Sequence, residues 1–301
     1  MANQVDVEVP VALDGARVDK ALAELFSVSR AVAADVVAAG VEIDGAPARA
    51  SDRVRGGQIL RCEPPVAGVP LRPEAVDFTV VHEDEEVIVV DKPAGVVVHP
   101  GSGRSGGTLA AGLIHRFPEL EGVGAADRWG LVHRLDKDTS GVLLVARTPD
   151  AFRFLSSEMR QRRVERIYTA LVEGRMAAPT GTVDAPVGRD PKQPTRRAVA
   201  PTGKPARTHY EVIRYYEGAD ASLLELRLET GRTHQIRVHM AAIDHPVVGD
   251  LTYGATRRDL GSPRTFLHAA GLEFTHPQSG KRVKVEAPLP TDLSAMLDRL
   301  S

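Results

Sequence analysis

The stretch GLVHRLDKDTSGVLLVART, residues 130–148, places a densely charged loop between two apolar segments. Its centre, HRLDKDTSG at 133–141, contains two acids, two bases and a histidine, and the apolar run 142–146 that follows predicts a buried strand. A solvated turn is one interpretation, because Asp, Thr, Ser and Gly are common turn residues. A loop at the rim of a sheet is the other, and catalytic side chains are commonly mounted there.

A second polar cluster favours the catalytic interpretation. The segment GRTHQIRVH, residues 231–239, also begins where an apolar strand ends, and it carries Arg232 and Arg237. An aspartate held between arginines stays ionised at neutral pH. An ionised carboxylate is what a nucleophile or a base must supply. The sequence therefore predicts that the two polar clusters meet at one site.

A third segment indicates an anionic ligand. Residues 189–207 hold six basic residues and one acid, although the whole chain carries a net charge of only −2. A local basic footprint of this kind is typical of nucleic-acid binding. We expect Arg189, Arg196 and Arg197 to contact such a ligand.

Composition limits the class of protein. The 301 residues are 43% hydrophobic and 26% charged, as in ordinary globular proteins, and their number suggests about two domains. The single cysteine, Cys62, excludes an internal disulfide and a cysteine-cluster zinc site. The first residues lack a signal-peptide pattern and no apolar run reaches membrane-spanning length. We expect a cytoplasmic protein with no membrane partner, and a monomer.

The chain divides into two parts. Helical spacing from Val18, a cap at Ser29 and the turn Asp44-Gly45 predict a small α/β module over residues 1–63. A proline-rich linker follows at 64–75, and residues 76–301 form the second domain. Its strands are separated mostly by short turns. The expected fold class is therefore α+β, with a mostly antiparallel mixed sheet flanked by helices.

Two short patterns overlap in the loop GSGRSGG, residues 101–107. They match a dinucleotide-binding fingerprint and a hydrolase nucleophile elbow. An expected strand at 96–98 precedes the loop and an expected helix from Thr108 to Arg116 follows it, but Pro100 intervenes and no βαβ alternation follows. We interpret the segment as a connecting loop, and a nucleotide-dependent oxidoreductase is a minor alternative. We expect no metal, since His234 and His239 are five residues apart and no HExxH occurs.

The motifs together resemble the pseudouridine synthases of the RluA/RluD type. The matching segments, in chain order, are residues 80–103, 107–115, 130–148, 166–174, 231–241, 245–254 and 266–280. The resemblance covers roughly residues 76–297, and residues 13–62 resemble an S4 RNA-binding module. It implies the pseudouridine synthase fold and a cofactor-free isomerase that converts selected uridines of RNA to pseudouridine.

The resemblance also assigns roles. Asp136 matches the catalytic aspartate, either as a nucleophile on the sugar or as a base at the ribose 2′ position. Arg237 matches its ion-pair partner, and Tyr168 matches a tyrosine that stacks on the target base. Arg134 matches an arginine that fills the gap left by the flipped nucleotide, and Leu267 matches an apolar residue of the uracil pocket.

Further contacts with RNA follow from position in these motifs. We expect His133, Thr139 and Lys92 to contribute to substrate binding. The S4-like module departs from expectation, because residues 1–75 hold 8 Lys/Arg against 11 Asp/Glu, and its recognition helix retains only Arg30 as a basic residue.

Three interpretations remain. The leading one is modification of large-subunit ribosomal RNA during ribosome biogenesis. The same chemistry on transfer RNA is the first alternative, since selectivity depends on RNA shape. A non-catalytic RNA-binding or ribosome-assembly protein is the second, and the presence of Asp136, Tyr168 and Arg237 argues against it.

Overall fold

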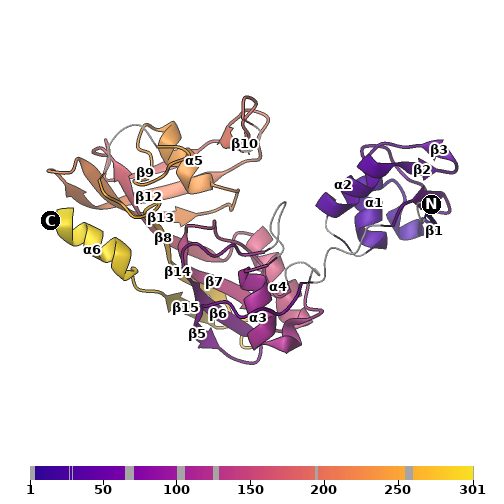
Figure 1. Cartoon of the computed structure of the whole chain (residues 1–301), viewed down its shortest axis with the longest axis horizontal. Coiled ribbons are helices and arrows are strands. Elements are labelled where there is room, and N and C mark those ends of the chain that lie inside the picture. The colour runs from indigo at the N-terminus through magenta and orange to yellow at the C-terminus, as the bar shows by residue number, and fades with distance from the viewer. Residues whose placement is uncertain are drawn as a thin grey trace.

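One large sheet organises most of the chain. A computed structural model describes residues 4–26, 28, 30–64, 71–99, 106–124, 129–193, 196–254 and 260–300, the side chains of residues 30, 31 and 35 excepted. Within these ranges nine strands form the sheet, in the order β5-β6-β7-β14-β8-β13-β12-β9, with β15 paired to β14 (Figure 1). The strands are β5 (Thr79–Glu83), β6 (Val87–Lys92), β7 (Ser140–Ala146), β8 (Glu165–Glu173), β9 (Thr180–Asp184), β12 (Arg207–Tyr216), β13 (Ala221–Leu228), β14 (Leu267–Thr275) and β15 (Arg282–Glu286).

The sheet is mixed but mostly antiparallel, which confirms the expected fold class. Its single parallel contact among the described strands joins β14 to β7, where His268 pairs with Ser140 and Ala269 with Gly141. Every residue of β7 is buried, as a central strand of mainly β-branched and leucine side chains requires. This strand begins at the end of the charged loop, so the loop lies at the edge of the core.

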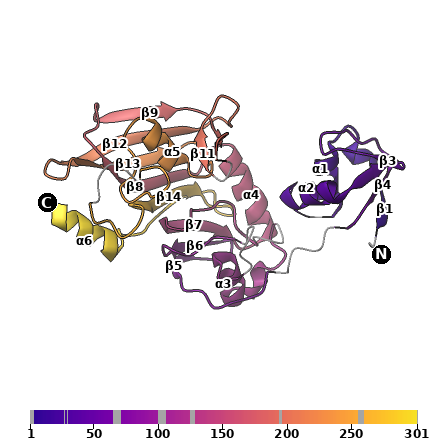
Figure 2. The same ribbon diagram turned by 45° about the horizontal axis from the view of Figure 1, so that its top comes forward.

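Two of the helices that cover the sheet begin at a threonine cap. The helices of this region are α3 (Leu109–Arg116), α4 (Pro149–Arg160), α5 (Gln235–Ala242) and α6 (Thr291–Leu300), with a 3₁₀ turn at Pro118–Leu120. The hydroxyls of Thr108 and Thr148 accept hydrogen bonds from the backbone nitrogens of Ala111 and Ala151, and so satisfy free donors at the starts of α3 and α4. Contacts join α4 to β7 and α5 to β12 (Figure 2).

The N-terminal residues have a sheet and a core of their own. Strands β1 (Val5–Glu8), β4 (Ile59–Cys62), β2 (Val41–Ile43) and β3 (Ala46–Pro47) form a four-stranded sheet in that order. They accompany a 3₁₀ turn at Val11–Leu13 and the helices α1 (Val18–Leu25) and α2 (Arg30–Ala39). Leu22, Leu60 and Cys62 belong to a hydrophobic cluster distinct from the main one, and both views draw these elements apart from the large sheet (Figures 1 and 2).

A separate two-stranded hairpin carries part of the basic segment. It consists of β10 (Val187–Arg189) and β11 (Arg197–Val199), in which Arg189 is paired with Arg197. The expected strand at 96–98 is wrong, because Val97 makes only an isolated bridge to Thr108. The Ser29 cap, the Arg30 side chain, residues 65–70 of the linker and residues 101–105 of the glycine loop lie outside the described residues. No helix in the described ranges is both long and apolar enough to cross a membrane.

Candidate active site

The charged loop and the second polar cluster line one cleft. The cleft encloses about 570 Å³, and its walls come from the loop at 133–139, from α4, from β8, and from residues 228–237. The sequence predicted that these two clusters would meet, and the structure brings Asp136, Tyr168, Arg237, Arg134 and Leu267 together in the wall of the cleft. His133 and Thr139 also line it.

Lys92 and Arg264 bind backbone carbonyl oxygens of the charged loop and hold it in place. Lys92 is fully buried, and its Nζ donates hydrogen bonds to the carbonyl oxygens of Pro93 at 2.8 Å, Val96 at 2.9 Å and Lys137 at 3.1 Å. Burial lowers the pKa of Lys92 to about 8. The expectation that Lys92 binds substrate is therefore wrong, because the three hydrogen bonds use all three donors of its ammonium group. Its contact with Lys137 anchors the loop beside Asp136.

Arg264 supplies the second anchor. Its Nη1 donates to the carbonyl oxygen of Asp138 at 3.1 Å and its Nη2 to Ser140 Oγ at 3.1 Å. Asp292 pairs with the same guanidinium at 2.7 Å. Gly141 closes the loop with φ at +117°, and a Cβ there would lie 2.2 Å from the carbonyl oxygen of Ala269. Only glycine fits where β7 and β14 approach this closely.

Asp136 faces the cleft beside an arginine and a histidine. Its Oδ2 lies 3.5 Å from Arg237 Nη1 and 3.9 Å from His234 Nε2, and its side chain is 18% exposed. The carboxylate is thus reachable from the cleft, and the guanidinium of Arg237 faces it. The predicted pair of Asp136 and Arg237 is present at ion-pair distance.

Arg237 makes its closest contacts with a different carboxylate. Its Nε and Nη2 donate to Asp250 at 2.7 and 2.8 Å, and the Asp250 side chain has no solvent exposure. Burial alone would lower the pKa of Arg237, but the hydrogen bonds and charge of Asp250, together with the charge of Asp136, raise it. Asp250 therefore orients the guanidinium that faces Asp136.

Tyr253 connects this site to the basic hairpin. Its ring contacts the guanidinium groups of both Arg196 and Arg237, which lie 5.2 and 5.1 Å from the ring centre. Its hydroxyl accepts a hydrogen bond from the Arg197 backbone nitrogen at 3.0 Å and bonds His234 Nδ1 at 2.8 Å. Arg189, Arg196 and Arg197 are absent from the cleft wall. Tyr253 contacts Arg196 and Arg197 on one hand and His234 and Arg237 of the cleft on the other.

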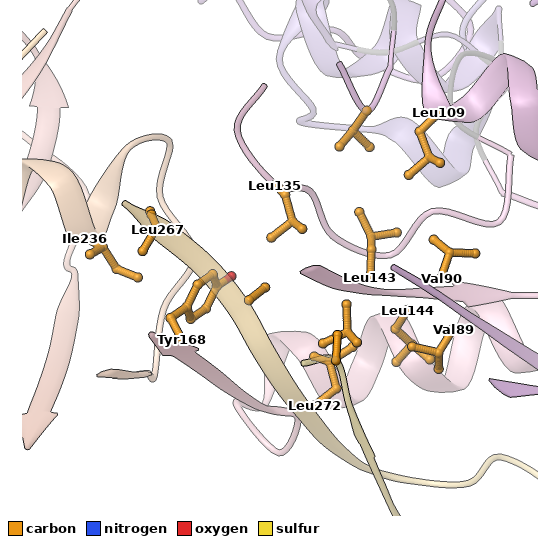
Figure 3. Close-up of a cluster of buried hydrophobic side chains, with 14 of the residues drawn as sticks. Val89, Val90, Leu109, Leu135, Leu143, Leu144, Tyr168, Ile236, Leu267 and Leu272 are labelled. Atoms are coloured by element: carbon orange, nitrogen blue, oxygen red, sulfur yellow. The ribbon is translucent and has the colours of Figure 1, made fainter. Parts of the chain in front are cut away.

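An apolar patch lies beside the carboxylate. Tyr168 on β8 is 6% exposed, and Leu135, Leu267 and Ile236 surround its ring (Figure 3). Burial raises the pKa of Tyr168 to about 12, so its hydroxyl stays protonated at neutral pH. A flat, apolar base fits against such a ring. The entrance is basic, since the exposed Arg134, Arg160 and Arg162 all line the cleft.

Sequence reasoning missed several residues of this site. Asp250 and Tyr253 lie within the matching segment 245–254, but no sequence pattern assigns them a role, and the histidine spacing raised His234 only as a metal ligand. Their burial and mutual contacts depend on the approach of α5 to the segment after it, which no local pattern reveals. Within the described ranges, no three His, Cys, Asp or Glu side chains gather as metal ligands would.

The sequence matches the family described as RNA pseudouridylate synthase over residues 86–242. The ribosomal large subunit pseudouridine synthase D of Nitrosomonas europaea is 44% identical over 99% of this chain and 88% of its own length. An uncharacterised RNA pseudouridine synthase of Chloroflexus aurantiacus is 46% identical over 99% of this chain and 94% of its own length.

Solved structures agree with these matches. The structure titled human RNA pseudouridylate synthase domain containing 1 has a TM-score of 0.58 and 29% sequence identity, and it covers 74% of this chain and 94% of its own. Human RNA pseudouridylate synthase domain containing 4 has a TM-score of 0.59 and 25% identity, with 74% and 92% covered.

Proposed function

The chain belongs to the RNA pseudouridylate synthase family and is thus an isomerase that acts on RNA, and from that premise we propose that it modifies specific uridines of large-subunit ribosomal RNA, with Asp136 as its catalytic carboxylate. One observation carries the assignment of the site. Asp136 lies 3.5 Å from Arg237 in a cleft whose apolar patch is formed around Tyr168 and Leu267. This arrangement combines a carboxylate paired with a guanidinium and a surface for a planar base.

The names of relatives support the class of RNA. Several relatives over 40% identical across nearly the whole chain are named for the large ribosomal subunit, including those of Nitrosomonas europaea and Xanthomonas campestris. The basic entrance at Arg134, Arg160 and Arg162 suits a polyanionic substrate. We place the activity in the cytoplasm, where ribosomes are assembled and where the RNA would be encountered.

The reaction requires the target uridine to leave its stack. A stacked uridine cannot present its glycosidic bond to a carboxylate in a cleft, and flipping a nucleotide costs a few kcal/mol. Stacking of a base on Tyr168 would return about 1–3 kcal/mol. Arg134, exposed beside Asp136, is placed to fill the gap in the RNA.

Asp136 then acts on the ribose by one of two routes. Its carboxylate attacks C1′, or it takes the proton from C2′, and either route breaks the bond from C1′ to N1 of uracil. The uracil rotates against Tyr168 and its C5 bonds to C1′. Arg237 pairs with the Asp136 carboxylate, and Asp250 keeps Arg237 in place.

We also propose a division of the chain into two domains and a linker. Residues 1–63 form the S4-like RNA-binding module, 64–75 the linker and 76–301 the catalytic domain. The separate sheet and hydrophobic cluster of the N-terminal residues support this division. The Arg189, Arg196 and Arg197 side chains of the hairpin lie outside the cleft wall and contact RNA beyond the target nucleotide.

Tritium release from C5 of uridine tests the proposal, since C5 loses its hydrogen when it becomes bonded to C1′. The purified protein should release tritium from a large-subunit rRNA transcript, whereas Asp136→Asn should bind the transcript with similar affinity and release none. Asp138→Asn, an exposed carboxylate in the same loop, is the matched control and should stay near wild type. Release by Asp136→Asn would refute its role, and release only from transfer RNA would correct the substrate.

A further inference from the structure

A buried arginine in the cleft has no carboxylate partner among the described residues. Arg166 on β8 is 6% exposed and lines the cleft, and its Nη2 donates to the carbonyl oxygen of Leu228 at 3.2 Å. Its Nε is buried and has no hydrogen-bond partner. A buried cation without a counter-ion is costly. Such a group is retained where a ligand supplies the missing negative charge.

Arg166 faces the same way as the stacking tyrosine. Residues two apart on a strand project from the same face, and on β8 both Arg166 and Tyr168 are buried while Ile167 between them is less so. A base stacked on Tyr168 therefore has the guanidinium of Arg166 on one side. Asp136 also acts electrostatically on Tyr168, so the tyrosine lies within reach of both charges.

A second unpaired donor lines the cleft. His133 Nε2 accepts a hydrogen bond from the Leu144 backbone nitrogen at 2.9 Å, and burial lowers the pKa of His133 to about 3. The neutral ring therefore carries its proton on Nδ1, which is buried and without a partner. His133 is hydrogen-bonded to Leu144 of β7, Arg166 belongs to β8, and β14 lies between these two strands in the sheet. Both residues present donors that lack an acceptor.

We propose that Arg166 and His133 form a subsite for a carbonyl oxygen of the target uracil, and that the subsite stabilises the uracil anion after it leaves the ribose. This inference rests on the proposed function. If Asp136 attacks C1′, an oxygen–carbon bond forms as the bond to N1 breaks. If Asp136 takes the C2′ proton, a double bond forms between C1′ and C2′. The electron pair of the broken bond goes to uracil in both cases, and the negative charge spreads over N1, O2 and O4.

The subsite also serves the second half of the reaction. The ring donates an electron pair from C5 to C1′, which releases the Asp136 carboxylate or allows its proton to return to C2′. The adduct is then neutral, and it becomes pseudouridine when the C5 proton passes to water and N1 takes up a proton from water. A fixed guanidinium in a site of low dielectric stabilises the transient anion without reorganising. The uracil is thereby retained while it rotates.

The glycine of the second polar cluster makes room for this group. A Cβ on Gly231 would lie 2.5 Å from Arg166 Nη1, so a larger residue there would displace the guanidinium.

A phosphate oxygen is the other ligand whose chemistry would suit Arg166. The exposed arginines at the entrance, Arg160 and Arg162, are available for phosphates, whereas Arg166 is buried beside the apolar patch that receives the base.

A leaving-group experiment tests the inference. Single-turnover consumption of the target nucleoside is measured in RNA that carries uridine or 5-fluorouridine at that position, with the wild type and Arg166→Met. Fluorine stabilises the ring anion by withdrawing electrons. We expect Arg166→Met to consume uridine about 100-fold more slowly, with a clearly smaller loss on 5-fluorouridine. Arg166→Lys, which keeps the charge, should recover much of the rate.

Further variants separate catalysis from folding. Gly231→Ala keeps the arginine but displaces it, and it should show the same dependence on the leaving group. Arg227→Met, an exposed arginine of β13, should leave both rates unchanged. Unfolding curves and RNA affinity show whether each variant is folded.

Three results would be decisive against the inference. Equal losses on both nucleosides would overturn it and leave the proposed function standing. A weaker RNA affinity with a lower salt slope and an unchanged rate at saturating RNA would identify a phosphate contact and also overturn it. A wild-type protein that consumes neither nucleoside would overturn the proposed function, and this inference with it.

Discussion

Arg237 donates two hydrogen bonds, of 2.7 and 2.8 Å, to Asp250, a carboxylate that solvent does not reach. The same guanidinium lies 3.5 Å from Asp136 through its remaining nitrogen. The two carboxylates thus have different environments. Asp250 is enclosed and orients the arginine, while Asp136 faces the cleft.

Replacing Asp250 by asparagine should slow catalysis without removing any group that touches substrate. The amide keeps the shape but weakens the hold on Arg237, and a displacement of about 1 Å at a reacting group costs on the order of 100-fold in rate. We expect a loss of that order in single-turnover tritium release, with little change in RNA affinity. Asp6→Asn is the matched control, since Asp6 accepts two hydrogen bonds from Arg61 in the N-terminal module. An Asp250→Asn enzyme with the wild-type rate would show that Arg237 is oriented by other contacts.

Lys92 should make stability depend on alkaline pH. Its folded-state pKa of about 8 lies below the ordinary 10.5. Between these values the unfolded chain binds more protons than the folded one, so the contribution of Lys92 to stability increases as pH rises and is lost as pH falls through 8. The unfolding free energy of the wild type minus that of Lys92→Met should increase by up to roughly 3 kcal/mol across this window.

Urea unfolding at pH 7.5 and at pH 10 measures this difference. Lys281→Met, at an exposed position, controls for the loss of a lysine. A difference that stays constant between the two pH values would mean that the ammonium of Lys92 is not desolvated as the structure indicates.

The basic hairpin should bind RNA through charge. Reversal of Arg189 and Lys192, which are exposed, to glutamate should weaken affinity. It should also lower the slope of log K against log salt by about one for each phosphate that the variant no longer binds. Lys281→Glu is the control for a reversed surface charge elsewhere. An unchanged slope in the double variant would remove the hairpin from the interface.

Gly141 should be intolerant of a side chain. Alanine there would combine a φ of +117° with a Cβ 2.2 Å from the Ala269 carbonyl oxygen. We expect a loss of at least about 2 kcal/mol in unfolding free energy. Gly280→Ala isolates the backbone component, since its φ is +67° and nothing lies near its Cβ, and it should cost about 1 kcal/mol. Equal losses in the two variants would contradict the close approach of β7 and β14.

Local patterns predicted several of the regular elements. The helix expected from Thr108 to Arg116 appears as α3, with Thr108 as its cap, and the strand expected at 142–146 lies within β7. Both depend on periodicity and capping, which are local properties. The prediction of a strand at 96–98 was wrong because Val97 makes only one isolated bridge. Whether a segment finds a neighbouring strand to pair with depends on the tertiary structure.

The site could be predicted only in part, for a related reason. Motif resemblance named Asp136 and Arg237, which the structure brings together. It also suggested Lys92 as a substrate contact, although the lysine is enclosed by backbone carbonyls. Charge in a sequence does not reveal whether a side chain faces a ligand or the core. Asp250 and Arg166 were missed because their roles follow from burial.

A map of pseudouridines in cellular RNA tests the central claim most directly. Carbodiimide treatment followed by primer extension is applied to cells that lack the gene and to cells that re-express the wild type or Asp136→Asn. We predict stops at specific large-subunit rRNA uridines that only the wild type restores. The same map in all three strains, with no uridine that depends on the gene, would contradict the account.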